Sequence, residues 1–289
     1  GLFEFNIEEK RFHSVPLPDE RTYKLNSQKN GTLLVGTWGG GLVEVDADTG
    51  EVGKQHLSSR KSFSISHDIV YSLFRDDAGI LWIGTNGGGI NKMHEPENEF
   101  TYFGSDPEDP DSLSQGKVTA ILRDSRDTLW IGTYNGGLNR YDADEERMVH
   151  YRADQDDPHS LCNDIVTDIF EDSTGTLWIS TNGGLNRYDR TRDRFDVFQK
   201  GEPPLELNDN IIYMLEEDAE GRIWIGTYSA GLTRYDPQTN EVRHYTHDPE
   251  DSRSLSDNLV YDLLIDSEGT LWVGTNNGLN RYLPGRNAF

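Results

Sequence analysis

The chain has 289 residues, with 27 Lys or Arg against 51 Asp or Glu, so its formal net charge is −24 and its sequence pI is about 4.6. So acidic a surface repels the phosphates of nucleic acids and of anionic lipids, which disfavours both as partners. No apolar run reaches the roughly 18 residues of a membrane-spanning helix, and the single Cys162 excludes an intrachain disulfide and a cysteine-based zinc site.

The first residues of the chain match its last ones. Gly1–Phe12 aligns with Gly278–Phe289, which is the second half of a repeat. We therefore expect the chain to begin in the middle of one repeat and to end at the close of another.

A threonine that precedes a glycine-rich turn recurs along the chain at a nearly fixed spacing of 48, 48, 48, 46 and 48 residues. The six positions are Thr37, Thr85, Thr133, Thr181, Thr227 and Thr275. A period of about 40 to 50 residues with several short β-type runs in each copy is typical of a β-propeller.

Each full repeat predicts four short strands, and the third repeat serves as the example. Its β-type runs are Val118–Leu122, Leu129–Thr133, Leu138–Tyr141 and Met148–Tyr151. The connections are short, which favours antiparallel pairing, and the counterparts of the first turn carry Gly175 or Gly269 where a hairpin needs positive φ. No segment resembles a 10-residue amphipathic helix, so we predict an all-β fold.

No linker divides the sequence, and we predict a single β-propeller domain over residues 1–289. Its parts are an outer half-blade at 1–15 and full repeats at about 20–57, 66–103, 114–151, 162–198, 207–245 and 256–289. The first two strands of a repeat form the inner half of a blade, and the last two form its outer half. Seven outer halves but only six inner halves can be counted in the sequence. This favours seven four-stranded antiparallel blades, one of which lacks its inner strands here; the alternative is six blades and an N-terminal hairpin.

The pattern Leu-Trp-Ile-Gly-Thr-x-Gly-Gly-Leu-Asn-Arg-Tyr-Asp after an Asp-x-x-Gly turn, of which Gly175–Asp189 is one copy, resembles the two-component regulator propeller repeat. The resemblance covers essentially the whole chain. It implies that the chain is the periplasmic sensor region of a hybrid histidine kinase or of a related membrane signalling protein. The partners it implies are a small polar ligand or oligosaccharide and the downstream signalling domains of the same protein, with a homodimer as an option. It further implies that the targeting and anchoring segments lie outside this sequence.

Five repeats place a tryptophan at the same point of the second strand, and we interpret these residues as packing between blades rather than as a sugar-binding array. They are Trp82, Trp130, Trp178, Trp224 and Trp272, with Leu34 in the first repeat.

The residue after the repeated threonine alternates between aromatic and amide types, and we predict that it contributes to a ligand site at the central channel. The six residues are Trp38, Asn86, Tyr134, Asn182, Tyr228 and Asn276. In a propeller this loop shares a face with the start of the first strand, which adds polar side chains. Those residues are His67, Asp68, Gln115, Lys117, Asp164, Asp209 and Asp257. Aromatic rings beside amides and carboxylates suit a sugar, which offers C–H surface and hydroxyls.

Other interpretations stay open. The asparagines could instead cap turns in left-handed conformations. The carboxylates Asp68, Asp164, Asp209 and Asp257 would allow a glycoside hydrolase or polysaccharide lyase, but repeat-equivalent acids need no catalytic pair to explain them. A protein-interaction scaffold is the third possibility. No histidine or acidic spacing indicates a metal site, and no phosphate-loop motif occurs, so no cofactor is expected.

Overall fold

The computed structural model describes residues 1–6, 11–28, 31–59, 64–76, 79–94 and 99–289. Parts of the predicted half-blade 1–15 and of the repeats 20–57 and 66–103 therefore lie outside the described residues. All regular structure within the described residues is β, as predicted, and none of it is a helix that could cross a membrane.

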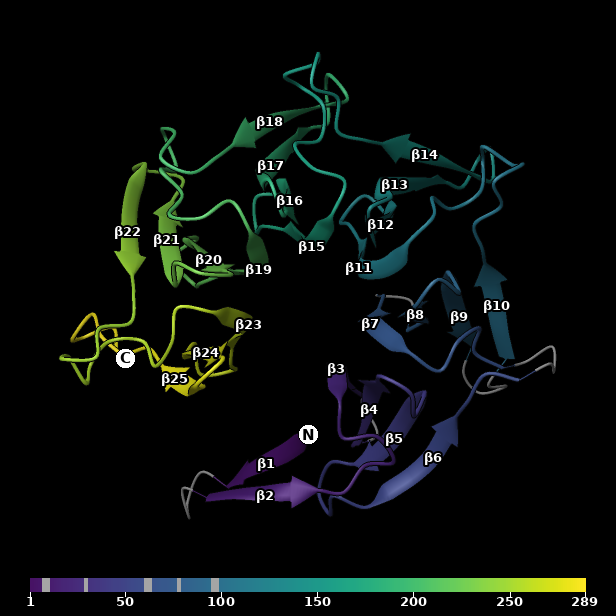
Figure 1. Cartoon of the computed structure of the whole chain (residues 1–289), viewed down its shortest axis with the longest axis horizontal. Coiled ribbons are helices and arrows are strands. Elements are labelled where there is room, and N and C mark those ends of the chain that lie inside the picture. Colours follow the sequence, from purple (N-terminus) through teal and green to yellow (C-terminus); the bar gives the residue numbers. More distant parts are fainter. Residues whose placement is uncertain (7–10, 29–30, 60–63, 77–78, 95–98) are drawn as a thin grey trace. The chain divides into compact units, whose positions relative to one another are not determined.

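The strands form antiparallel sheets that follow the chain in order (Figure 1). A two-stranded hairpin comes first, formed by β1 (Leu2–Asn6) and β2 (Arg11–Val15). The next two sheets are β3 (Thr22–Ser27), β4 (Thr32–Thr37), β5 (Leu42–Asp46) and β6 (Val52–His56), then β7 (Val70–Arg75), β8 (Leu81–Thr85), β9 (Ile90–His94) and β10 (Glu99–Phe103).

The following sheets repeat the same order of four strands. They are β11 (Lys117–Arg123), β12 (Leu129–Tyr134), β13 (Gly137–Asp142) and β14 (Arg147–Tyr151); β15 (Val166–Glu171), β16 (Leu177–Thr181), β17 (Gly184–Asp189) and β18 (Arg194–Phe198); and β19 (Ile212–Glu217), β20 (Ile223–Thr227), β21 (Leu232–Asp236) and β22 (Glu241–Tyr245). The last sheet has three strands, β23 (Val260–Ile265), β24 (Leu271–Thr275) and β25 (Gly278–Arg281).

The described residues thus form six blades and a separate N-terminal hairpin, which is the alternative stated from the sequence. Five blades have four strands, and a single bridge between Leu283 and Ala288 stands where the last blade would have its fourth strand. Within the described residues β1 and β2 form a two-stranded sheet of their own, so the structure matches six blades and a hairpin rather than seven blades. The excess of outer halves in the sequence is explained by the hairpin β1–β2.

By their contacts, the residues divide into two compact units. Unit 1 comprises Gly1–Arg123 and Asn139–Val149, and unit 2 comprises Asp124–Leu138 and His150–Phe289. In unit 1, one buried cluster includes Val70, Leu73 and Ile83, and another joins Leu2 of the hairpin to Val35 and Val43. In unit 2, one cluster forms around Ile212 and Ile225 and another around Val260 and Val273.

The repeated tryptophans are held by the acidic residue that opens the preceding turn. In unit 2 the indole N–H of Trp130 donates to Oδ2 of Asp124 over 2.8 Å, and Trp178 and Trp224 make the same bond to Asp172 and Asp218. The Trp130 ring lies 4.9 Å, centroid to centroid, from Tyr188 of the next blade, in an edge-on contact. The interpretation of these tryptophans as inter-blade packing is therefore confirmed.

The Asp-x-x-Gly turns have the predicted geometry. Gly175 and Gly269 have φ of +81° and +78°, a region that side chains with a Cβ rarely adopt. In each turn the backbone N–H of the glycine donates to the carbonyl oxygen of the aspartate, over 2.8 Å at Gly175 and 2.9 Å at Gly269.

Candidate functional site

The first strands of five blades, β3, β7, β15, β19 and β23, begin with a β-bulge. In β3, for example, Thr22 pairs with Thr37 and Lys24 with Gly36, which leaves Tyr23 without an opposite residue. The same shift occurs in β7, β15, β19 and β23. The bulged residues are Tyr23, Tyr71, Thr167, Tyr213 and Tyr261. A bulge changes the direction of its side chain, so each of these five blades presents the bulged residue at the start of its first strand.

The loop after the second strand meets the start of the first strand, as the sequence predicts. The backbone N–H of Trp38 donates to the carbonyl of Arg21 over 2.9 Å, and that of Tyr228 donates to Ile211 over 3.0 Å. The asparagines at the equivalent position make the same bond: Asn86 to Ile69, Asn182 to Ile165 and Asn276 to Leu259. None of these three asparagines has positive φ, so the suggestion that they adopt left-handed conformations is wrong.

In unit 1 the bulged tyrosines and Trp38 form what we call the first aromatic cluster, made of Tyr23, Trp38 and Tyr71. The rings of Tyr23 and Trp38 stack with centroids 5.7 Å apart, and Tyr71 meets Tyr23 edge-on at 4.8 Å. Burial, and next the neighbouring Tyr71, raise the pKa of Tyr23. Tyr23 is 46% exposed, and Trp38 and Tyr71 are partly exposed, although the hydroxyl of Tyr71 is buried.

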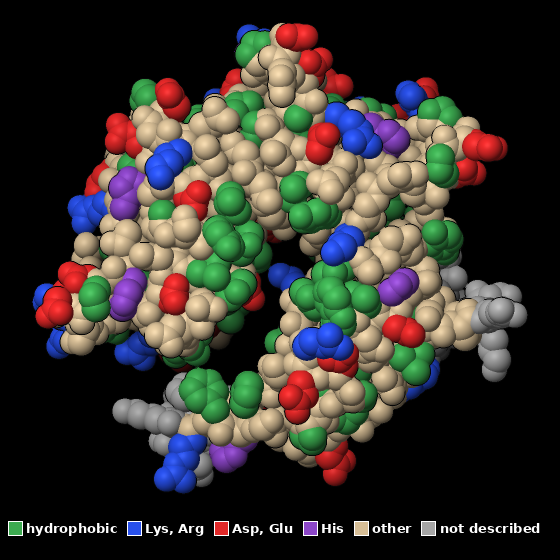
Figure 2. Space-filling view, viewed as in Figure 1, with side chains coloured by type: hydrophobic (Ala, Val, Ile, Leu, Met, Phe, Trp, Pro, Cys, Tyr) green, Lys and Arg blue, Asp and Glu red, His purple; other side chains and the backbone are tan. Residues whose placement is uncertain are grey.

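Two cations lie against the first aromatic cluster. The ammonium nitrogen of Lys117 is 5.2 Å from the ring centroid of Tyr71, and the guanidinium carbon of Arg21 is 5.6 Å from that of Trp38. Arg21 is also held by two hydrogen bonds to the carboxylate of Asp19. Figure 2 shows hydrophobic side chains, tyrosine included, gathered over β3 and β7 with Lys or Arg beside them.

Unit 2 contains a second aromatic cluster, made of Tyr213, Tyr228 and Tyr261. The Tyr213 ring lies 5.8 Å from Tyr228 and 6.2 Å from Tyr261, measured between centroids. Burial raises the pKa of Tyr213, and the charges of Tyr228, Tyr261, Tyr134 and Asp209 raise it further. Tyr228 and Tyr261 are 46% and 53% exposed, which is high for aromatic residues in a strand-rich fold. Hydrophobic side chains gather over β19 and β23 in Figure 2.

Several of the residues predicted at the start of the first strand accept hydrogen bonds from the backbone of their own loop. Nδ1 of His67 accepts from the backbone N–H of Ile69, and Oδ1 of Asp209 and of Asp257 accept from Ile211 and Leu259 in the same way. Oδ2 of Asp209 accepts two further hydrogen bonds from Ser229, one from its backbone N–H over 2.9 Å and one from its hydroxyl over 2.7 Å. These groups shape the loops that carry the aromatic residues.

Asp68 and Asp164 fix the connection from the preceding blade. Asp68 accepts from the backbone N–H of Ser58, and Asp164 accepts from Ala153 over 2.8 Å and lies 3.7 Å from Arg152. Repeat-equivalent acids with these backbone partners need no catalytic role. Of the remaining predicted residues, Gln115 is exposed, and Asn86 and Asn182 are half-buried. Nδ2 of Asn276 donates a hydrogen bond to Oδ2 of Asp257 over 3.3 Å.

Sequence reasoning missed the four bulged tyrosines. The available signal is an aromatic residue directly after the first buried residue of the first strand, as in Val70-Tyr71 and Ile212-Tyr213. The bulge itself depends on strand register, which the sequence does not display.

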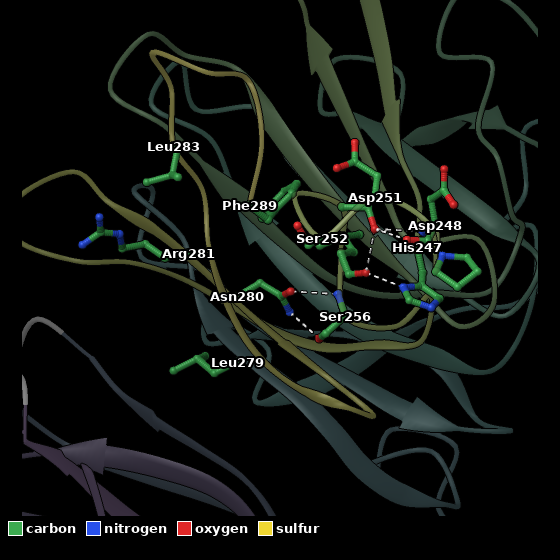
Figure 3. A pocket seen from close by; sticks show the side chains of 13 residues that line it. His247, Asp248, Asp251, Ser252, Ser256, Leu279, Asn280, Arg281, Leu283 and Phe289 are labelled. Carbon is green, nitrogen blue, oxygen red and sulfur yellow. Dashed lines mark hydrogen bonds between the residues drawn. The ribbon is translucent and has the colours of Figure 1, made fainter. Parts of the chain in front are cut away.

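A hollow of about 440 Å³ lies where the last inter-blade loop meets β25 (Figure 3). In that view Asn280 bonds Ser256, its Oδ1 accepting from the backbone N–H over 2.8 Å. The acids beside it, Asp248 and Asp251, accept hydrogen bonds from the backbone of their own loop. A similar hollow of about 430 Å³ lies at the equivalent loop around Asp154 and Asp157, so this is a feature of the repeat. Among the described residues no group of three or more His, Cys, Asp or Glu could hold a metal ion.

Comparison with known proteins points to one family. The family model described as the two component regulator propeller matches residues 64–87, 112–135, 160–183, 206–229 and 254–277. No curated protein matches the chain.

Several solved structures share the fold at low sequence identity. One is the extracellular domain described as that of the hybrid two component system BT3049 from B. thetaiotaomicron, with TM-score 0.57 and 21% identity over 92% of this chain and 40% of that one. PorZ, a surface component of the type-IX secretion system of Porphyromonas gingivalis, has TM-score 0.69 and 16% identity over 89% and 38%. Virginiamycin B lyase from Staphylococcus aureus has TM-score 0.67 and 13% identity over 94% and 84%. The chain thus spans less than half the length of the first two.

Proposed function

We propose that this chain, which carries the repeats of the two component regulator propeller family, is the ligand-recognising part of an extracytoplasmic sensor. The ligand would be a carbohydrate or another small polar molecule, bound on the exposed aromatic residues at the start of the first strands. The observation that carries the proposal is the pair of aromatic clusters. Three bulged tyrosines, Tyr23, Tyr71 and Tyr213, meet Trp38 or Tyr228 of the loop after the second strand, and the fourth, Tyr261, stacks on Tyr213.

The chemistry of the clusters suits a sugar. A pyranose ring offers C–H faces that lie on aromatic rings and hydroxyls that need polar partners. The first aromatic cluster has Lys117 and Arg21 beside its rings, and the second has Asp209 near Tyr213. A packed core would bury such rings, whereas Tyr23, Tyr228 and Tyr261 are each about half exposed.

A sensor role fits one of the proteins that share the fold. The structure from B. thetaiotaomicron is described as an extracellular domain of a two component system. For this chain we propose a periplasmic location and downstream signalling domains in the same protein. A ligand would signal by binding one arrangement of the protein more tightly than another.

A thermal-shift screen against soluble oligosaccharides tests the proposal, since a ligand that binds only the folded state raises the melting temperature. We expect at least one oligosaccharide to do so in the wild type and not in a variant that combines Trp38→Asn with Tyr228→Asn. Asparagine occupies the equivalent position in other repeats, so these changes are compatible with the loop. No stabilisation by any member, or equal stabilisation of both proteins, would contradict the proposal.

Chromatography of the same mixtures separates binding from turnover. A sensor leaves the oligosaccharide intact, whereas products of cleavage or elimination would assign the clusters to a polysaccharide-active enzyme.

A further inference from the structure

The turn after β17 places an arginine between two blades. Nη1 of Arg190 donates to Oδ2 of Asp124 over 2.6 Å, and Nη2 donates to Oε1 of Glu171 over 2.9 Å. The side chain of Arg190 is only 14% exposed. Glu171 is itself fixed, because it accepts from the backbone N–H and the hydroxyl of Ser125. Asp124 and Glu171 therefore form a cradle for one guanidinium group.

The same cradle recurs one repeat later without its arginine. Asp172 stands where Asp124 does and accepts from the indole of Trp178 over 2.8 Å, as Asp124 does from Trp130. Glu217 stands where Glu171 does and accepts from the backbone and the hydroxyl of Ser173, both over 2.6 Å.

The position of Arg190 is taken by Pro237 in this repeat. The first aspartate caps both turns in the same way: Oδ1 of Asp189 accepts from the N–H of Thr191 over 2.9 Å, and Oδ1 of Asp236 accepts from that of Gln238 over 2.8 Å. Pro237 therefore stands at the equivalent point of a similarly capped turn, without a guanidinium-bearing side chain.

In two other blades the aspartate equivalent to Asp172 pairs with an arginine from a different position, whereas Asp172 does not in the part of the chain that the structure describes. Arg123 pairs with Asp76 over 2.9 Å, and Arg222 pairs with Asp218 over 2.7 Å. Within the described residues Asp172 has hydrogen bonds from Trp178, Thr174 and the backbone, but no cation.

A cavity fills the place of the lost side chain. It has a volume of about 480 Å³ and is lined by Asp172, Glu217 and Pro237 together with Trp178, Phe198 and Tyr235. Asp172 is only 7% exposed. The lining also contains Arg187, which forms an ion pair with Asp196 at 2.8 Å. Among the described residues of this lining, Asp172 and Glu217 are therefore the carboxylates that have no cation as a partner.

We propose that this cavity of unit 2 is a binding site for a ligand that bears an alkyl guanidinium group. The guanidinium would donate to Oδ2 of Asp172 and to Oε1 of Glu217, as Arg190 donates to Asp124 and Glu171. A planar fork of N–H donors matches two carboxylates better than a single ammonium does. The alkyl stem would lie along the aromatic and proline side chains of the lining.

Isothermal titration calorimetry with agmatine, a free alkyl guanidinium, tests the site. We expect one molecule to bind the wild type. Asp172→Asn should weaken binding at least tenfold, and Pro237→Arg should abolish it, because the new side chain occupies the cradle as Arg190 does in the preceding repeat. N-Butylurea, which has a similar shape and no charge, should not bind.

Arg190→Ala is the matched control, because it empties the neighbouring cradle. This variant should bind two agmatine molecules instead of one. A blocked Arg-amide and a tripeptide with central arginine then distinguish the sources of the group: tighter binding of the peptide assigns the site to an arginine side chain, and tighter binding of agmatine assigns it to a small guanidine. Absence of binding to the wild type, or equal binding to the Pro237→Arg variant, would overturn the proposal.

Discussion

Asp124 keeps its charge although its side chain is completely buried. Burial opposes the ionised form, but hydrogen bonds from Trp130 and Arg190 outweigh it and lower the pKa of Asp124. The same balance lowers the pKa of Asp76, through Trp82, the backbone N–H of Ile80 and Arg123. These carboxylates thus join the turn, the tryptophan and a neighbouring arginine into one unit.

Replacing Arg190 by alanine should destabilise the protein by about 3 kcal/mol at neutral pH, because removal of one partner leaves the other charge buried and unpaired. Urea unfolding measures this cost. Arg192→Ala is the control: Arg192 pairs with Asp189 but is 67% exposed, so its loss should cost less than about 1 kcal/mol. Equal costs for the two variants would contradict the buried-pair account.

The cost of Arg190→Ala should fall in acid. A carboxylate with a lowered pKa stabilises the folded state above its unfolded pKa of 3.8, and this contribution is lost as the pH falls through the folded value. Without Arg190 the pKa of Asp124 rises, so protonation removes the unpaired charge at a higher pH. Urea unfolding at pH 7 and pH 3 should show a smaller difference between variant and wild type at pH 3; an unchanged difference would exclude Asp124 as the cause.

At the scale of strands, the middle of the second strand decides how closely blades approach. A Cβ added to Gly84 of β8 would lie 2.6 Å from Cγ1 of Val118 and 2.2 Å from Oγ of Ser72. Around the equivalent Gly274 of β24 the nearest atom is 3.7 Å away. The glycine of β8 is therefore required by packing, whereas the glycine of β24 is not.

Gly84→Ala should destabilise the protein by about 1–3 kcal/mol through overpacking, and Gly274→Ala should change the stability by less than about 0.5 kcal/mol. Thermal or urea unfolding of the two variants checks the difference. Neither glycine has positive φ, so backbone strain does not contribute. A similar effect at both sites would mean that the blades pack differently from this description.

The bulges at the start of β3, β7, β15, β19 and β23 accept more than one residue type. Four bulges carry tyrosine and β15 carries Thr167, so the backbone accepts both. Tyr213→Thr should therefore leave the stability within about 1 kcal/mol of the wild type while removing the central ring of the second aromatic cluster. Unfolding curves measure the first effect. A large loss of stability would show that Tyr213 is a packing residue.

At the scale of the whole chain, the repeat made the fold predictable. The spacing of Thr37 and its counterparts gave the blades and the strand order, and the Asp-x-x-Gly turns gave the hairpins. The single-domain boundaries remain a prediction. The sequence does not determine the number of blades, because a hairpin such as β1–β2 and the outer half of a blade have the same sequence pattern.

The candidate site was predictable only in part. The alternation of aromatic and amide residues after the repeated threonine predicted Trp38, Tyr134 and Tyr228 as ligand-binding residues, and their role stays a prediction. The sequence did not identify Tyr71 or Tyr213, whose positions depend on a register shift. The contrast between Arg190 and Pro237 also lay in the sequence, but its meaning depends on contacts between residues of neighbouring repeats.

The measurement that tests the central claim most directly is calorimetric titration with the oligosaccharide that stabilises the wild type most. Three proteins are compared: the wild type, Trp38→Asn and Tyr213→Thr. In both variants the new residue is of a type that other repeats have at the equivalent position. The account predicts that at least one variant, still folded, loses affinity tenfold or more, since an aromatic stacking contact in such a site is worth about 1–3 kcal/mol by analogy with stacked bases. Unchanged affinity in both folded variants would contradict the assignment of the ligand site to the aromatic clusters.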